Sequence, residues 1–167
     1  MKLYNRPQWS RIINIADGER GILQTVSMMR EIVGQYKTDA EVRGQALALV
    51  AHLPQKDEYG EIEAVFNFVR DHIRYVKDVY DVETIHTPDK MLEIQQGDCD
   101  DKCVLLASLL ESIGYQTMFK VTGYDGPDFQ HVYVFASGLT CAMHLDPTEP
   151  ESAGWEAPNP TNFLYVH

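Results

Sequence analysis

The chain has 167 residues, a formal net charge of −11 and a hydrophobic content of 44%. These values are typical of one soluble globular domain with its own core, and they exclude a largely disordered chain. The charge argues against a nucleic-acid partner, because such proteins use Lys and Arg to displace counterions from phosphates. No stretch approaches the roughly 18 consecutive apolar residues of a membrane span, so we expect no span and a cytoplasmic protein.

Residues 20–73 carry a helical pattern. Apolar side chains recur at helical spacing in three segments, 20–36, 38–53 and 62–73. The second segment opens with a capping-box pattern, in which Thr38 is followed three residues later by Glu41. Because amphipathic stripes usually face a core, we interpret these helices as packing support, with a docking surface as the alternative. Residues 2–15 are interpreted as an arm or short strand, and 78–82 as an extended piece.

A short turn before Cys99 joins two further helices. Thr87 and Pro88 are typical of a helix start, and Gly97 is expected to end that helix in the left-handed conformation. Cys99 then begins an apolar helix that runs to Gly114. Unpaired N–H groups and the dipole at a helix N-terminus favour a thiolate, so a nucleophilic cysteine fits here. A buried cysteine beside a helix cap would produce the same pattern.

The last third of the chain changes to a β pattern. Alternating or β-rich segments predict strands over residues 117–121, 131–136, 140–145 and 162–166. Proline, glycine and acidic residues between them indicate a surface loop at 147–161. We therefore expect an α+β fold, in which N-terminal helices and a central helix starting at Cys99 pack on a small antiparallel sheet.

Three residues could form a catalytic triad on this fold. Thiol acyl transfer needs a nucleophile, a base and a group that orients the base. His131 would open one strand and Asp146 would close the next, and in an antiparallel hairpin these positions are neighbours. Cys99 could then reach His131 from the start of its helix. Thiolate formation is opposed by three acidic residues beside the thiol, Asp98, Asp100 and Asp101.

Four stretches resemble the core of the transglutaminase-like superfamily. They are Gly97-Asp98-Cys99-Asp100-Asp101-Lys102, Gly114-Tyr115, His131-Val132-Tyr133-Val134 and Leu145-Asp146-Pro147-Thr148. The resemblance covers residues 74–148 as a catalytic core within a single domain, 1–167. It leaves 20–73 as a helical portion and 149–167 as a C-terminal loop with a possible edge strand. The helical portion is similar to that of small single-domain members encoded in phages and prophages.

The resemblance implies a cysteine peptidase or amidase that works without a cofactor on a protein or peptide substrate. Cys99 would be the nucleophile, His131 the general base and Asp146 the residue that orients it. The thioacyl intermediate would be resolved by water, or by an amine in a cross-linking enzyme. The oxyanion would be held by the Cys99 N–H and by one further donor, for which the candidates are Gln95, Gln96 and His86.

Two other readings compete with catalysis. Zinc could be bound by a set of sulfur and nitrogen ligands, Cys99, Cys103, Cys141, His131 and His144. We expect no metal, because Cys141 and His144 should face opposite sides of a strand and the cysteine spacing is not that of a zinc knuckle. Alternatively, the fold serves as a structural or assembly protein of a phage particle, which would place it in a virion with phage proteins as partners.

Overall fold

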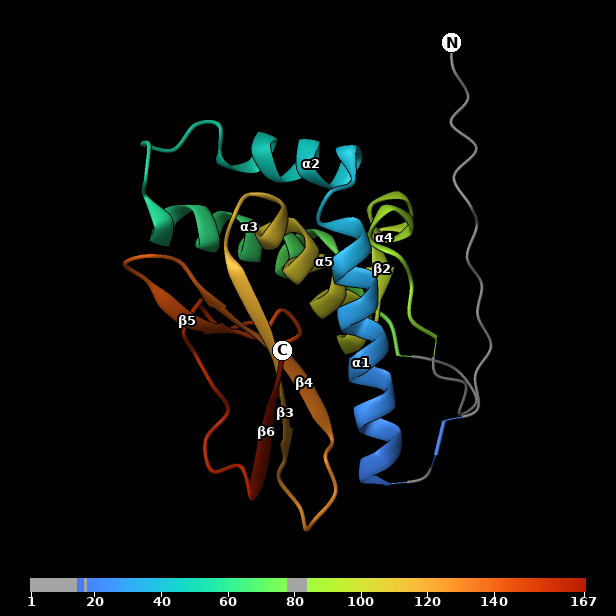
Figure 1. The fold of residues 1–167 in the computed structure, drawn as a ribbon. Helices are drawn as coiled ribbons and strands as arrows, with labels where there is room; N and C mark the ends of the chain where they lie inside the picture. Colours follow the sequence, from blue (N-terminus) through green and yellow to red (C-terminus); the bar gives the residue numbers. More distant parts are fainter. Residues whose placement is uncertain (1–14, 17, 78–83) are drawn as a thin grey trace.

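The computed structural model describes residues 15–16, 18–77 and 84–167 (Figure 1). In chain order they form α1 (Glu19–Tyr36), α2 (Ala40–Val50), α3 (Glu58–His72), β1 (Arg74–Tyr75), α4 (Pro88–Ile94), β2 (Gln96–Gly97), α5 (Cys99–Ser112), β3 (Gln116–Gly123), β4 (His131–Ser137), β5 (Ala142–Leu145) and β6 (Asn162–Val166). Residues 2–14 of the expected arm and the extended piece over 78–82 lie outside the described residues.

The longer strands form one antiparallel sheet in the order β5-β4-β3-β6. Val132 of β4 pairs with Val121 of β3, and Val134 pairs with Leu145 of β5. All four side chains are buried, which gives the sheet one apolar face. The strand predicted near the C-terminus is β6, and it forms one edge of the sheet. Separately, β1 and β2 form a short parallel pair.

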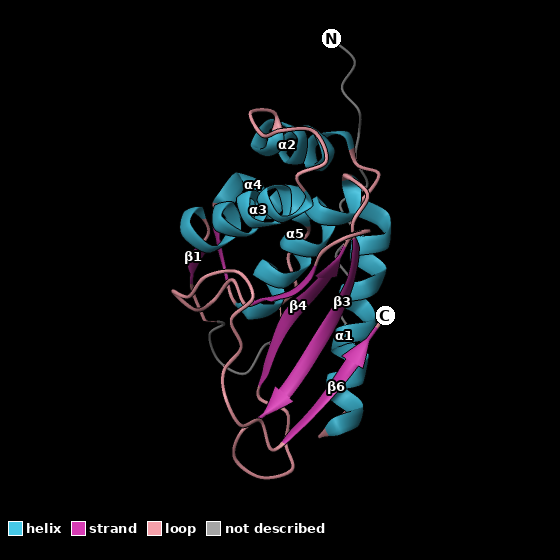
Figure 2. Cartoon of the chain, turned by 90° about the vertical axis from the view of Figure 1, so that its left-hand side faces the viewer, coloured by secondary structure: helices cyan, strands magenta, loops and turns pink. Residues whose placement is uncertain are grey.

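Helix α5 lies at the centre of the fold. It contacts all four other helices as well as β3 and β4, and Figure 1 shows it between the helices α2 and α3 and the sheet. Its leucines are fully buried: Leu105, Leu106, Leu109 and Leu110. Figure 2 shows α1 running alongside the sheet, so that α1 and α5 both cover it. The predicted α+β arrangement of helices on a small antiparallel sheet is thus confirmed.

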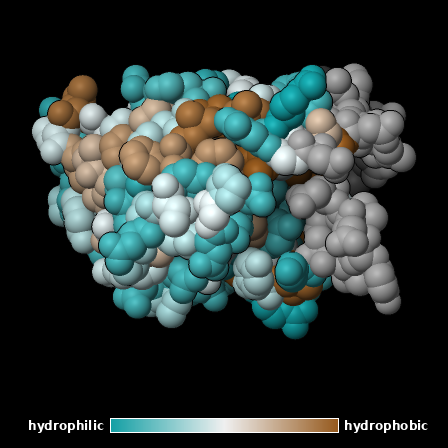
Figure 3. Space-filling model, turned by 90° about the horizontal axis from the view of Figure 1, so that it is seen from below, coloured by the Kyte–Doolittle hydropathy of each residue, from teal (hydrophilic) through white to brown (hydrophobic). Residues whose placement is uncertain are grey.

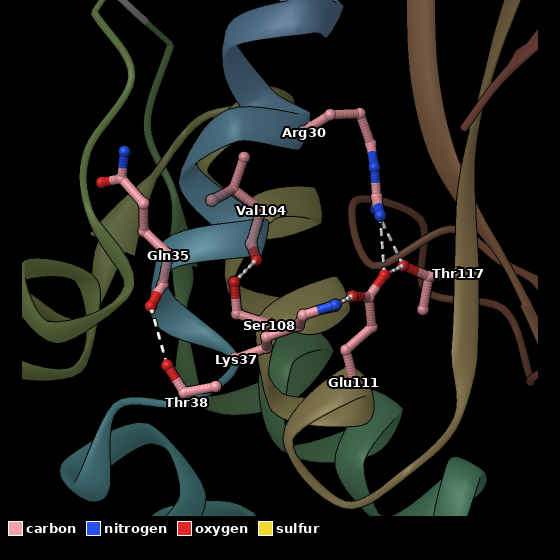
Figure 4. Close-up of polar contacts among 8 residues, drawn as sticks. All are labelled: Arg30, Gln35, Lys37, Thr38, Val104, Ser108, Glu111 and Thr117. Atoms are coloured by element: carbon pink, nitrogen blue, oxygen red, sulfur yellow. Dashed lines mark hydrogen bonds and ion pairs between the residues drawn. The ribbon is translucent and has the colours of Figure 1, made fainter.

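Polar contacts fix the C-terminal end of α5. The guanidinium of Arg30 on α1 donates to Glu111 Oε1 at 2.8 Å and to the Thr117 hydroxyl at 3.1 Å (Figure 4). Lys37 Nζ lies 3.3 Å from the other Glu111 oxygen. These bonds join α1, α5 and β3 at one end of the helix. The position of the opposite end, which carries Cys99, depends on a separate set of contacts.

Two local predictions are wrong. The N-cap of α2 is Asp39, whose carboxylate accepts from two backbone N–H groups, so the Thr38 capping box does not form. Helix α4 ends with Gln95 in the left-handed conformation, at φ 52°, and Gly97 does not have a positive φ. Gly97 is needed for space, because a Cβ there would lie 2.6 Å from Asp101 and 2.7 Å from Met91.

The surface is a mixture of hydrophilic and hydrophobic residues, as the view from below shows (Figure 3). The large apolar side chains that are most exposed are Leu139, Phe163, Tyr59 and Tyr75. Within the described residues, no helix is both long enough and apolar enough to cross a membrane.

Candidate active site

A capping box places Cys99 at the first position of α5. The Asp98 carboxylate accepts from the N–H groups of Asp100 and Asp101, at 3.1 and 3.2 Å, and Asp101 accepts in return from the Asp98 N–H. These bonds satisfy donors that would otherwise be unpaired at the helix start. The predicted position of Cys99 at a helix N-terminus is confirmed, and two of the neighbouring acids serve as caps.

Asp101 also ties the turn to the preceding segment. Its carboxylate is fully buried and accepts from the His86 N–H at 2.7 Å, with His86 Nδ1 at 3.0 Å. No partner for His86 could be predicted from the sequence, because His86 and Asp101 come together only when α4 folds back on α5. This contact holds the chain just ahead of α4 against the turn that carries Cys99.

Lys102 joins the same turn to α3. Its side chain is only 2% exposed, and its ammonium donates to the carbonyls of Arg70 and Ile73 at 3.2 and 2.9 Å. Burial lowers the pKa of Lys102. Its side chain nevertheless hydrogen-bonds to carbonyls that the end of α3 leaves unpaired. Because β1 follows α3 directly, Lys102 also positions β1 beside the turn.

The structure brings His131 and Asp146 together. His131 Nε2 lies 2.7 Å from Asp146 Oδ2, although the residues are 15 positions apart. The other carboxylate oxygen accepts from the Thr148 hydroxyl at 2.6 Å and from the Thr148 N–H at 3.1 Å. Asp146 is therefore held on two sides, and its bond to Nε2 leaves Nδ1 as the remaining nitrogen of the His131 ring.

The two groups stabilise each other's charged forms. Burial lowers the pKa of His131, but the hydrogen bond and charge of Asp146 outweigh burial and leave that pKa raised. Burial raises the pKa of Asp146, but His131 and Thr148 outweigh it and leave that pKa lowered. A smaller rise in the pKa of His131 comes from the charges of Glu149 and Asp100.

The surroundings of Cys99 oppose ionisation of its thiol. Its Sγ donates to Asp100 Oδ1 at 3.5 Å. Burial raises the pKa of Cys99 strongly, and the charges of Asp100 and Asp98 raise it further. Burial and the two carboxylates thus act against the thiolate that a helix N-terminus favours.

The first turn of α5 lies beside the start of β4. One turn beyond Cys99, the buried Cys103 Sγ lies 3.4 Å from the carbonyl oxygen of Val132, the residue after His131. The charge of Asp100, on the same turn, is near enough to raise the pKa of His131. Cys99 and His131 thus belong to elements that touch at this point, while Cys103 is a core residue as predicted.

The three candidate oxyanion donors lie around the turn and differ in their exposure and hydrogen bonds. Gln95 is exposed in the helix cap, and the side-chain oxygen of Gln96 accepts from Arg74 at 2.7 Å. His86 has one ring nitrogen on Asp101, as described above. Gln96 is therefore oriented with its amide N–H groups turned away from Arg74.

Sequence reasoning gave no role to Tyr75. It pairs with Gly97 across the β1–β2 ladder, and its side chain is 48% exposed. Burial raises the pKa of Tyr75, and electrostatic interactions with Cys99, Asp98 and Asp100 raise it further. Only the three-dimensional pairing with Gly97 brings Tyr75 beside the turn that carries Cys99, so the sequence carried little signal for it.

Two cavities lie away from these residues. One, of about 590 Å³, is lined by the start of α3 and residues 140–143, and the other, of about 430 Å³, surrounds the C-terminal end of α5. Neither is lined by Cys99, His131 or Asp146. In the described part of the chain, no group of three or more His, Cys, Asp or Glu side chains is arranged to hold a metal ion.

Solved structures with similar folds include two that are described as candidate proteases. A candidate protease from Parabacteroides distasonis is 12% identical, with a TM-score of 0.62 over 88% of this chain and 32% of its own. A candidate cysteine protease from Cytophaga hutchinsonii is 11% identical, with a TM-score of 0.53 over 86% and 56%. Calcium-bound LapG from Legionella pneumophila is 16% identical, with a TM-score of 0.51 over 83% of each chain.

This chain therefore spans about a third of the first neighbour and just over half of the second. No curated protein matches it. The family model of the transglutaminase-like superfamily matches residues 46–145, which is more than half of the chain. The chain belongs to the transglutaminase-like superfamily.

Proposed function

We propose that the chain is a thiol-dependent acyl-transfer enzyme, a cysteine peptidase or amidase, with Cys99 as nucleophile, His131 as base and Asp146 as the residue that orients it. The observation that carries this proposal is the bond between His131 Nε2 and Asp146, secured by Thr148. This bond orients the imidazole ring and leaves Nδ1 as the nitrogen that would take the thiol proton in the proposed triad. The fold shared with a candidate cysteine protease supports the same chemistry.

The reaction starts from a neutral thiol, because the pKa of Cys99 is raised. As Sγ bonds to the amide carbon, the thiol proton moves to His131 Nδ1, and the resulting imidazolium is stabilised by Asp146. His131 then returns the proton to the leaving amine, and the C–N bond breaks to give a thioester. Water, deprotonated by His131, attacks the thioester and releases a carboxylic acid and the free thiol.

The oxyanion needs two donors. The Cys99 N–H is one, and we propose the Tyr75 hydroxyl as the second, since Tyr75 pairs with Gly97 two residues before Cys99 and its pKa is raised. Gln96 and His86 remain candidates because both lie at the same turn, and Gln95 is a further candidate that is exposed in the helix cap.

A structural or assembly role in a phage particle is the second candidate, with phage proteins as partners. The observation that favours a non-catalytic role of this kind is the raised pKa of Cys99. In that role Cys99 would be an inert buried thiol.

The test is acylation by p-nitrophenyl acetate, followed by peptide mass mapping. We expect an acetyl adduct at Cys99 that forms and decays in the wild type, none at this position in Cys99→Ala, and slower formation in Asp146→Asn. Cys141→Ala is the matched control and should behave as wild type. Adding a primary amine separates hydrolysis from transamidation by its product. Turnover by Cys99→Ala at the wild-type rate would contradict the proposal.

A further inference from the structure

We propose that the free edge of β1 binds the acyl-donor substrate as an extended peptide strand that leads to Cys99. This inference rests on the proposed function and names its substrate class, a polypeptide rather than a small amide. The evidence is the backbone of β1, its exposed apolar side chains and its position beside the turn.

Among the residues that the structure describes, β2 alone pairs with β1. The N–H groups of Arg74 and Val76 both donate to β2, to the carbonyls of Gln95 and Gly97 at 2.9 Å. In a parallel ladder alternate residues face the partner strand, so the N–H and C=O of Tyr75 point to the opposite side. Within the described residues, these two groups have no hydrogen-bond partner. A peptide strand can use both of them, as in other cases of strand addition at a sheet edge.

The edge lies beside the turn that carries the thiol. Lys102 holds the end of α3, from which β1 departs, and Tyr75 pairs with Gly97, two residues before Cys99. An added strand would run alongside β1, one strand spacing of about 4.8 Å away, so that one of its residues pairs with Tyr75. The rest of the peptide then extends toward the turn and brings an amide to Cys99.

The side chains at this edge favour an apolar peptide. Tyr75 is 48% and Val76 is 37% exposed, and successive strand residues face opposite sides, so both faces of an added strand meet an apolar group. Neither of the two cavities described above is lined by Cys99, so the proposed contacts come from this open edge.

The test compares two electrophiles with the same reactive group. Chloroacetone has no peptide, whereas an N-acetylated tetrapeptide of alanine and valine that ends in a chloromethyl ketone can pair with β1. In both reactions Sγ bonds to the methylene carbon, chloride leaves and the thiol proton goes to His131. Labelling rates at each cysteine are read by mass spectrometry, and the peptide amides are N-methylated one at a time.

We expect the peptide to label Cys99 about tenfold faster than chloroacetone, because each added hydrogen bond contributes up to about a factor of ten. Methylating the one amide that pairs with the Tyr75 carbonyl should remove most of this gain, while methylation of its neighbours should not. Val76→Lys should slow the peptide and leave chloroacetone unchanged. Leu139→Lys, at a 97% exposed position outside the site, should change neither rate.

Equal rates for the peptide and chloroacetone, or equal rates for all N-methylated peptides, would overturn the inference and leave the proposed function standing. If both electrophiles label Cys141 before Cys99 in the wild type, the proposed function fails and this inference fails with it. Either result is read from the same mass spectra.

Discussion

Replacing His131 with Ala should reverse the order in which the thiols of Cys99 and Cys141 are alkylated. Cys141 is less perturbed: its pKa is raised by burial and by the charge of Glu58. Cys99 is more deeply buried, and the charges of Asp100 and Asp98 add to a stronger rise in its pKa. Without help from a base, Cys141 is the better nucleophile.

The size of the effect follows from the thiolate populations. A thiol with the ordinary pKa of 9.0 is about 1% ionised at pH 7, and each further unit reduces this tenfold. Cys99 therefore starts below Cys141 in thiolate content. A general base typically contributes about 10² to 10⁴ in rate. This gain is available to Cys99 and not to Cys141, and we expect it to exceed the deficit in thiolate when His131 accepts the proton.

The assay is limited labelling by iodoacetamide, with the two cysteine peptides quantified by mass spectrometry. In the wild type Cys99 should label first, and its rate should rise with pH above about 6.5, because His131 must lose its proton to act as base and its pKa is raised. In His131→Ala, Cys141 should label first. Labelling of Cys141 first in both proteins, or of Cys99 first in both, would refute the reasoning.

Three further changes test the contacts that assemble the site. Thr148→Val removes the hydroxyl that donates to Asp146, so acetylation by p-nitrophenyl acetate should slow by about tenfold while urea unfolding changes little. Gly97→Ala should lower the free energy of unfolding in urea by about 1–3 kcal/mol, because its Cβ would overlap neighbouring side chains. Lys102→Met should cost about 1–3 kcal/mol by the same assay, since it leaves two carbonyls unpaired. Lys90→Met, on the exposed surface of α4, is its control and should stay within about 0.5 kcal/mol of wild type.

Periodicity predicts the elements of this fold well, since helical and alternating patterns depend on neighbours along the chain. It also places His131 beside Asp146, because antiparallel pairing puts the start of one strand next to the end of the other. Contacts between distant segments carry no such signal. Asp101 meets His86, and Lys102 meets the end of α3, only through tertiary packing.

Gly97 shows how one residue type can have two structural causes. A glycine after a helix usually supplies a positive φ, and this general rule led to the wrong prediction of the helix end. Here Gln95 adopts the left-handed conformation, and Gly97 instead makes room for Asp101 and Met91. The glycine in the sequence indicates that a side chain is excluded at position 97. The reason for the exclusion depends on the residues that pack against this position.

The acids around Cys99 link the stability of the site to its chemistry. Asp98 and Asp101 cap α5, and Asp101 also holds His86, so removing either charge to favour the thiolate would loosen the turn that positions the thiol. Asp100 raises the pKa of Cys99 and also that of His131. In the proposed mechanism, the charge of Asp100 that opposes a resting thiolate therefore also stabilises the imidazolium formed when His131 takes the proton. A site built in this way favours proton transfer during attack over a preformed ion pair.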